Sequence, residues 1–283
     1  FLRWCYLASS MSDIDKILEL EPHGADAFVG ESPLYEWGRI YGGLVIAQSL
    51  RAAMRTVDVE GHKVHSLHAY FILGGDPNEP VRYEVDRLRN GRSFSTRRVV
   101  ARQSGGAILN LSCSFQRDEE GPDVSTSMFP SDVKPPEDSK RIEWGIGVDA
   151  RLELESTQPA RHRIWIKFTG SLAEDEDDHF AALAYLSDSN PMDAIVTAHP
   201  DHSLLGDDPN EAAWDETFMA ASLDHSVWFH RSVRADQWLL FDLAPHQIKG
   251  TRGLATGDVF TAEGELVATV AQQGLVRVRS GDI

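Results

Sequence analysis

The stretch from Gly105 to Phe115, with the sequence GGAILNLSCSF, is the strongest indicator of the fold of this chain, because the second half repeats its pattern. Two glycines make a turn, and an alternating apolar strand follows them. The stretch from Gly264 to Gln272, GELVATVAQ, has the same layout. The same offset separates two further turn glycines, Gly91 and Gly250. Repetition at a fixed offset indicates a duplicated sheet module, which makes a pseudo-dimer within one polypeptide.

Each module is expected to hold one buried helix and an antiparallel sheet. In the first module, a helix that opens at Tyr41-Gly42-Gly43 and runs through Val57 is apolar nearly all round, as buried helices are. In the second, residues 180–186 predict the helix. Alternating patterns predict strands over 65–73, 81–86, 93–102, 107–116, 164–168, 226–231, 237–243, 253–261 and 266–278. We expect the two sheets to pair edge to edge, because an open edge invites aggregation.

A polar segment divides the chain. Residues 117–141 are rich in Asp, Glu, Pro, Ser and Lys, which is typical of a linker held by few contacts. The expected division is an N-terminal module over 11–117, a linker over 118–141 and a C-terminal module over 142–279. Met11 is the expected natural initiator, so residues 1–10 would be upstream sequence. Residues 200–215 are expected to form a loop.

Composition narrows the function. The chain has 283 residues, of which 42% are hydrophobic, so a sizeable core can be buried. Its 44 acidic and 27 basic residues give a net charge of −17, which argues against nucleic acid and anionic membrane as partners. Cys5 and Cys113 are the only cysteines, too few for a disulfide framework, so a reducing cytoplasm fits best. Residues 1–10 are too short to span a membrane and lack a signal-peptide core.

A set of short motifs in both halves resembles the acyl-CoA thioesterase II family, the TesB-like double-hotdog enzymes. The motifs are Tyr41-Gly42-Gly43, 47–50 (AQSL), 65–71 (HSLHAYF), 74–77 (GGDP), 91–99 (GRSFSTRRV), 114–116 (SFQ), 185–188 (YLSD), 224–231 (DHSVWFHR), 238–240 (WLL) and 272–277 (QQGLVR). The resemblance covers residues 11–277. It implies an α+β fold, a double hotdog in which each module wraps an antiparallel sheet around a central helix.

The resemblance also implies an activity: hydrolysis of acyl-CoA thioesters, of medium to long chain, to free fatty acid and CoA, without a cofactor. In this family a carboxylate, a hydroxyl and a glutamine hold the attacking water, and these positions correspond to Asp188, Ser222 and Gln272. The C-terminal module would thus carry most catalytic residues. Serine replaces the family's usual threonine at 222, and Leu44 stands where the helix motif often has glutamine.

The residues themselves support this assignment in part. Asp188 follows an apolar helix, where an unpartnered carboxylate is costly, so it is either a helix cap or a base whose pKa desolvation raises. Gln272 shares the parity of the apolar residues Leu266, Ala268 and Val270, so it is either a core amide or an orienter of water. Ser222 lacks the Gly-x-Ser-x-Gly context of a nucleophilic serine. Both a covalent acyl-Asp188 and a general-base route remain open.

Four further residues are predicted to contact the substrate. Gly42 and Gly43 open the first helix, whose N–H groups are candidate oxyanion donors. His65 is expected either to line a substrate path or to make structural hydrogen bonds. Arg92 belongs to the densest basic cluster, which also contains Arg97, Arg98 and Arg102. These arginines are expected to form cross-strand pairs on a solvated face, or else to hold the CoA phosphates.

The sequence also contains features of metal sites and of other functions. His65 and His68 face opposite ways along one strand, as do His225 and His230, which is unlike a zinc site. The acidic run 174–178 is better suited to a helix N-terminus than to a metal. Residues 188–192, DSNPM, resemble the motif of hotdog enoyl-CoA hydratases, but aspartate at 193 replaces the required histidine. A non-catalytic acyl-CoA-binding module is the other alternative. By resemblance, a homodimer or homotetramer acting in fatty acid and lipid metabolism is expected.

Overall fold

The computed structural model describes residues 17–35, 37–144, 147–170, 172, 174–206 and 211–279. The expectations about Met11, Cys5 and residues 1–10 lie outside these residues. The elements that the structure describes in the first half are β1 (Glu21–Pro22), β2 (Ala27–Gly30), α3 (Gly42–Met54), β3 (His62–Phe71), β4 (Val81–Asn90), β5 (Phe94–Gln103) and β6 (Gly106–Arg117).

The second half begins with a 3-10 turn, η1, and adds a hairpin before its helices. Its elements are η1 (Pro136–Asp138), β7 (Lys140–Ile142), β8 (Val148–Thr157), β9 (Ala160–Phe168), α4 (Glu176–Ser187), α5 (Ser189–Thr197), η2 (His202–Leu205), α6 (Glu211–Thr217), β10 (Phe218–Ser222), β11 (Asp224–Phe229), β12 (Leu239–Lys249), β13 (Arg252–Thr261) and β14 (Leu266–Val278). The expected loop over 200–215 instead contains η2 and α6 within its described part.

The two halves share one sheet. Its strand order is β1-β2-β4-β5-β6-β3-β11-β14-β13-β12-β9-β8-β7, with β10 paired to β14 beside this path. Strands β3 and β11 join the halves antiparallel, with Leu67 opposite Val227. The predicted edge-to-edge pairing is confirmed, and each half protects the inner edge of the other.

The duplication is visible in the strand order. Outward from the junction, β3-β6-β5-β4-β2 in the first half corresponds to β11-β14-β13-β12-β9 in the second. The sequence His65-Ser66-Leu67-His68 in β3 aligns with His225-Ser226-Val227-Trp228 in β11. The strand register makes Phe115 of β6 the equivalent of Gln272 of β14. Phe115 follows Ser114, which pairs with Ser66, and Gln272 follows Ala271, which pairs with Ser226. The two halves therefore have equivalent positions with different chemistry.

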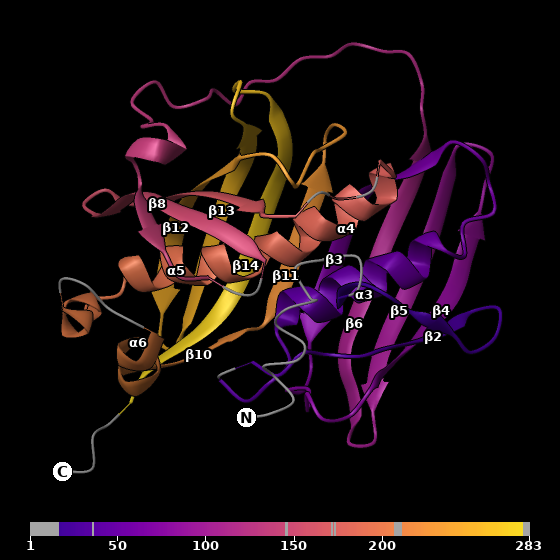
Figure 1. Cartoon of the computed structure of the whole chain (residues 1–283), viewed down its shortest axis with the longest axis horizontal. Helices are drawn as coiled ribbons and strands as arrows, with labels where there is room; N and C mark the ends of the chain where they lie inside the picture. Colours follow the sequence, from indigo (N-terminus) through magenta and orange to yellow (C-terminus); the bar gives the residue numbers. More distant parts are fainter. Residues whose placement is uncertain are drawn as a thin grey trace.

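The helices complete the double hotdog. Figure 1 shows α3 lying along the first-half strands, α5 among the second-half strands, and α4 between them. Helix α3 packs against β4, β5 and β6, whereas α5 packs against β9, β12, β13 and β14. Helix α4 packs mainly on α3, so the interface between the halves is made by two helices as well as by two strands.

The predicted linker is held more firmly than expected. Trp165 donates its indole N–H to the Lys134 carbonyl at 2.8 Å, and Asp132 accepts from Arg163 at 2.9 Å. The Phe129 ring packs edge-on against Phe260, with centroids 5.6 Å apart. The expectation of few contacts is therefore wrong for residues 129–134, because side chains of β9 and β13 contact them. The exact domain boundaries remain a prediction.

Three strands of the second half, β7, β8 and β10, were not predicted. Strand β8 has alternating Leu152 and Leu154, but the register shifts between these residues and most of the strand is only half-buried. Strand β10 is five residues long and bears alanines and a serine that carry no clear alternation. By contrast, β14 spans the predicted residues 266–278, and Cys113 is a buried free thiol as expected.

Candidate active site

A break between two helices creates the site. Ser187 ends α4 and Ser189 begins α5, so Asp188 lies between them. Pro191 explains the break, because it has no N–H to donate to the Ser187 carbonyl and its ring crowds that carbonyl. The Asp188 carboxylate makes no capping hydrogen bond to α5, and the residue is only 3% exposed. The Asp188 side chain therefore does not cap α5, the helix that it precedes.

Asp188, Ser222 and Gln272 are joined by hydrogen bonds. Ser222 Oγ donates to Asp188 Oδ1 at 3.1 Å. Gln272 Nε2 donates to Ser222 Oγ at 2.9 Å. Gln272 is fully buried on β14, as its parity predicts, and Ser222 is the last residue of β10. Three residues that are distant in sequence therefore form one polar row, in which Asp188 and Gln272 are buried and Ser222 is half-buried.

The environment of Asp188 raises its pKa to about 7. Burial is the main cause, because it disfavours the charged carboxylate. Hydrogen bonds from the Ser222 hydroxyl and the Gly43 N–H oppose the rise. The result is a carboxyl group that gains and loses its proton near neutral pH.

Gly42 and Gly43 bring the first half to this carboxylate. A Cβ on Gly42 would lie 2.6 Å from Asp188 Oδ2 and 2.8 Å from the Phe71 ring. A Cβ on Gly43 would collide with the backbone oxygen of Tyr185 and the ring of Tyr41. Only glycine permits this approach of α3 to α4. Because the Gly43 N–H bonds to Asp188, it differs from the free oxyanion donor that was expected.

Aromatic side chains surround the start of α5, and this arrangement was not predicted from the sequence. Tyr41 donates to the Tyr185 carbonyl at 2.8 Å and accepts from the Ser189 N–H at 3.2 Å. Trp144 donates its indole N–H to Ser189 Oγ at 3.0 Å. Tyr35 shares a hydrogen bond with the Tyr185 hydroxyl. The only sequence signal was the density of aromatic residues at 35–41.

His65 and Arg92 lie elsewhere. His65 lines a separate cavity of about 410 Å³ at the start of β3, together with Lys63, Glu176 and Arg231. Arg92 is an exposed turn residue whose carbonyl accepts a hydrogen bond from His62. Since Phe71 at the far end of β3 is the residue beside Gly42, the structure does not bring His65 or Arg92 to Asp188.

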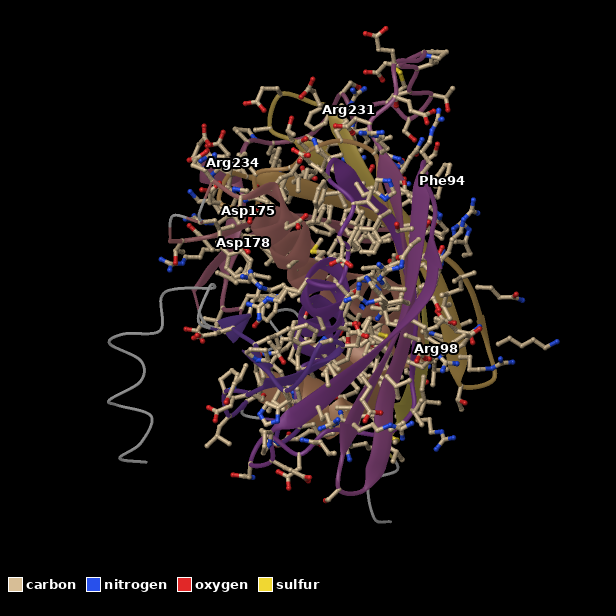
Figure 2. All side chains as sticks on the ribbon, turned by 90° about the vertical axis from the view of Figure 1, so that its right-hand side faces the viewer. Phe94, Arg98, Asp175, Asp178, Arg231 and Arg234 are labelled. Atoms are coloured by element: carbon tan, nitrogen blue, oxygen red, sulfur yellow. The ribbon has the colours of Figure 1, made fainter. Side chains whose placement is uncertain are left out.

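The arginine cluster is split between two environments. Arg98 pairs with Asp86, and Arg102 pairs with Glu84, on the exposed face of the sheet, and Figure 2 shows Arg98 pointing outward. Arg97 is fully buried and donates to both oxygens of Thr56, so the expectation of a solvated side chain is wrong for this residue. Its donors are satisfied within the core, which leaves no free fork for a phosphate.

The alternatives to this site find little support in the geometry. Among the described residues, no group of histidine, cysteine, aspartate or glutamate side chains is arranged to hold a metal ion. The acidic run caps α4, with Asp175 accepting from the Asp177 N–H at 3.2 Å, and Asp175 and Asp178 lie at the same end of the molecule as Arg234 (Figure 2). Asp193 faces His162 of β9 at 4.0 Å and makes no bond to Asp188. No helix within the described ranges is long and apolar enough to cross a membrane.

Comparison with known families agrees with this geometry. Residues 32–116 match the N-terminal domain of acyl-CoA thioesterases, and residues 119–276 match their C-terminal domain. The chain belongs to the acyl-CoA thioesterase family. Its TesB-like relatives place it among the acyl-CoA thioesterases II.

Relatives of this thioesterase cover nearly its whole length. Mouse acyl-coenzyme A thioesterase 8 is 33% identical over 94% of this chain and 89% of its own. Acyl-CoA thioesterase 2 of Haemophilus influenzae is 30% identical over 96% and 99%. The crystal structure of an acyl-CoA thioesterase II from Mycobacterium marinum superposes with a TM-score of 0.79 at 36% identity, over 95% of this chain and 99% of that one. A hot dog protein from Alicyclobacillus acidocaldarius, at 20% identity, shares the fold with a TM-score of 0.76.

Proposed function

We propose that this enzyme hydrolyses acyl-CoA thioesters with a water molecule held by Asp188, Ser222 and Gln272. The observation that carries the proposal is the hydrogen-bonded row from Gln272 Nε2 through Ser222 Oγ to Asp188 Oδ1, with steps of 2.9 and 3.1 Å. The row combines a base, a hydroxyl and an amide at the junction of both halves. This is the set of groups needed to hold and deprotonate one water.

The chemistry follows from the ionisation of Asp188. A carboxyl group with a pKa of about 7 is partly ionised at neutral pH and therefore suits a general base. Asp188 takes one proton from water while the water oxygen bonds to the thioester carbonyl carbon. The carbon–sulfur bond then breaks, its electron pair goes to sulfur, and the Asp188 proton passes to the departing CoA thiolate. The products are a carboxylic acid and CoA, and Asp188 is ionised again.

Ser222 and Gln272 act by orientation. A thioester carbonyl is already electrophilic, so positioning the water supplies much of the acceleration, roughly 7–11 kcal/mol in well-oriented systems. Ser222 is fixed from both sides, by Asp188 and by Gln272. The fixed hydroxyl offers the water a polar contact beside the base.

A general base is favoured over a covalent acyl-Asp188. Two donors, the Ser222 hydroxyl and the Gly43 N–H, already bind the carboxylate and stabilise its charge, which weakens it as a nucleophile. Oxygen-18 water in a single turnover detects an acyl-Asp188 that water cleaves at the aspartyl carbon. A general base sends the label into the acid product alone, whereas hydrolysis of an acyl-Asp188 at the aspartyl carbon leaves label in the protein.

We propose medium- to long-chain acyl groups as the substrates. Apolar side chains close to the carboxylate, Tyr41, Phe71 and Tyr185, support this choice over short polar acyl groups. Thiol release from a panel of acyl-CoA chain lengths tests both the activity and the preference. Tight acyl-CoA binding without thiol release would favour a binding module, and hydration of enoyl-CoA would favour the hydratase.

A cytoplasmic homodimer or homotetramer is proposed as the working form. The buried free thiol of Cys113 suits a reducing compartment. Tyr70 of β3 and Trp228 of β11 are exposed apolar side chains near the junction of the halves, where a second copy could cover them. Light scattering of the purified protein gives the assembly, and a monomer at working concentration would refute it.

A further inference from the structure

The polar row of the active site continues beyond Gln272. The Oε1 atom of Gln272 lies 2.5 Å from His225 Nδ1. His225 Nε2 lies 2.8 Å from Ser187 Oγ. All of these side chains are buried. Since Ser187 precedes Asp188 in the chain, five polar groups form a loop that begins and ends on adjacent residues.

An ionised Asp188 fixes the direction of every hydrogen bond in this loop. A carboxylate only accepts, so Ser222 must donate to it. The Ser222 oxygen then accepts from the Gln272 amide nitrogen, and the Gln272 oxygen is left facing His225. That oxygen needs a donor, so the histidine must carry its hydrogen on Nδ1. The bare Nε2 in turn accepts from the Ser187 hydroxyl.

A protonated Asp188 reverses the loop. The carboxyl group then donates to Ser222, which donates to a Gln272 amide rotated by half a turn. The amide nitrogen donates to a bare Nδ1 of His225, and the ring carries its hydrogen on Nε2. Ser187 accepts from that nitrogen, and its own hydrogen goes to the Ala184 carbonyl, 2.9 Å away. Each direction satisfies every group in the loop, and the ionisation of Asp188 selects between them.

Both hydrogen-bond directions require a neutral His225, and the surroundings of the ring keep it neutral. Burial lowers the pKa of His225 to about 4, with the Gln272 contact as the opposing influence. The elements packed on the ring present Ala69 from β3, Gln272 from β14 and Ser187 from α4, none of which is charged. The titratable side chain that faces Asp188 from the N-cap of α3 is Tyr41, whose pKa is raised well above its usual value, so it stays neutral.

The first half lacks this loop. His65 occupies the position equivalent to His225, but Phe115 stands where the second half has Gln272. His65 Nε2 has no hydrogen-bond partner among the described residues. The histidine is thus linked to a side-chain amide only in the half that contains the carboxylate.

We infer that His225 is a positioning residue, held by Ser187, which turns the Gln272 amide so that the Ser222 hydroxyl points at the ionised Asp188. This role rests on the proposed function for its effect on turnover, but the hydrogen-bond direction does not. At equilibrium, His225 carries its hydrogen on Nδ1 when Asp188 is ionised and on Nε2 when Asp188 is protonated.

The tautomer is read directly from the wild-type enzyme by nitrogen-15 NMR with labelled histidine. We expect His225 to carry its hydrogen on Nδ1 well above the pKa of Asp188, and on Nε2 well below it. A hydrogen that stays on Nε2 at both extremes, or a doubly protonated ring, overturns the inference. This measurement needs no turnover, so it tests the hydrogen-bond direction independently of the proposed enzymatic activity.

Two variants test the effect on turnover. His225→Leu removes the donor to Gln272, and we expect kcat to fall on the order of 100-fold with little change in KM, because the water is misoriented. His225→Asn places an amide N–H near the former Nδ1 and should restore at least about tenfold of that loss. His246→Leu, an exposed histidine bonded to Thr256, is the control. Equal rates for the leucine and asparagine variants would reduce His225 to a packing role.

Discussion

Gly42 and the Asp188 carboxylate are in contact across the two halves: a Cβ on Gly42 would lie 2.6 Å from Asp188 Oδ2. Gly42 begins helix α3 of the first half, and Asp188 lies between helices α4 and α5 of the second. The duplication therefore does more than enlarge the sheet, because each half supplies a wall of the same site. The base comes from the second half and its close backbone neighbour comes from the first.

This contact predicts the effect of Gly42→Ala. The new methyl group collides with Asp188 and with the Phe71 ring, so either α3 or the carboxylate must shift. We expect kcat/KM to fall at least about tenfold, since small displacements of reacting groups are costly. Gly121→Ala is the matched control, because nothing lies within 4 Å of its added Cβ. Full activity of the Gly42 variant would show that the carboxylate needs no such close wall.

The pH dependence follows from the raised pKa of Asp188. A general base works only when ionised, so kcat/KM should fall as the pH drops through about 7, with unit slope. Initial rates of thiol release across a pH series give the profile, with folding at each pH checked by circular dichroism. An inflection near the ordinary aspartate range would mean that burial does not control this group.

The hydroxyl at position 222 is tested by a pair of substitutions. Ser222→Ala removes both the donor to Asp188 and the acceptor for Gln272, and we expect kcat to fall about 10–100-fold. Ser222→Thr keeps both roles and should retain the rate within about threefold, because its extra methyl only restricts the rotamer. Steady-state kinetics of both variants decide the matter. A threonine variant as impaired as the alanine one would point to steric rather than polar control.

Arg97 is predicted to stabilise the fold without touching CoA. Arg97→Met strands both oxygens of Thr56 in the core, and we expect the free energy of unfolding to drop by about 2–4 kcal/mol with KM unchanged. The exposed Arg98→Ala, which breaks only a surface pair with Asp86, should cost less than about 1 kcal/mol. Denaturant titrations and KM values give both numbers. A higher KM in the Arg97 variant at unchanged stability would return this residue to the phosphate site.

Local patterns predicted much of this structure. Alternation along 266–278 gave β14 and the inward direction of Gln272, and the repeated glycine turns predicted the paired sheets. The end of a helix before Asp188 was predicted, whereas the helix that follows it, α5, was not, because Pro191 is unfavourable in a helix interior. The tethering of Phe129 and Asp132 was also missed, since those contacts depend on side chains more than thirty residues away.

The histidines show a different limit. Strand parity separated His225 from His230 correctly, and the zinc site was rejected on that ground. Parity cannot reveal that Ser187 and Gln272 flank the His225 ring, because one comes from α4 and the other from β14. His65 and Arg92 were expected near the substrate, yet the structure places neither of them beside Gly42. Only the register of β3 against β6 and β11 shows which end of β3 lies at the site.

The most direct test of the central claim is thiol release by Asp188→Asn, compared with the wild type on the same acyl-CoA. The substitution keeps the size of the side chain and removes the base, so we expect kcat to fall about 10²–10⁴-fold. Because burial raises the pKa of Asp188, the free energy of unfolding falls as the pH rises from the ordinary aspartate pKa to about 7, and above that pH the variant should unfold at higher denaturant. A stable, folded Asp188→Asn protein that releases thiol within a few-fold of the wild-type rate would show that Asp188 is not the general base.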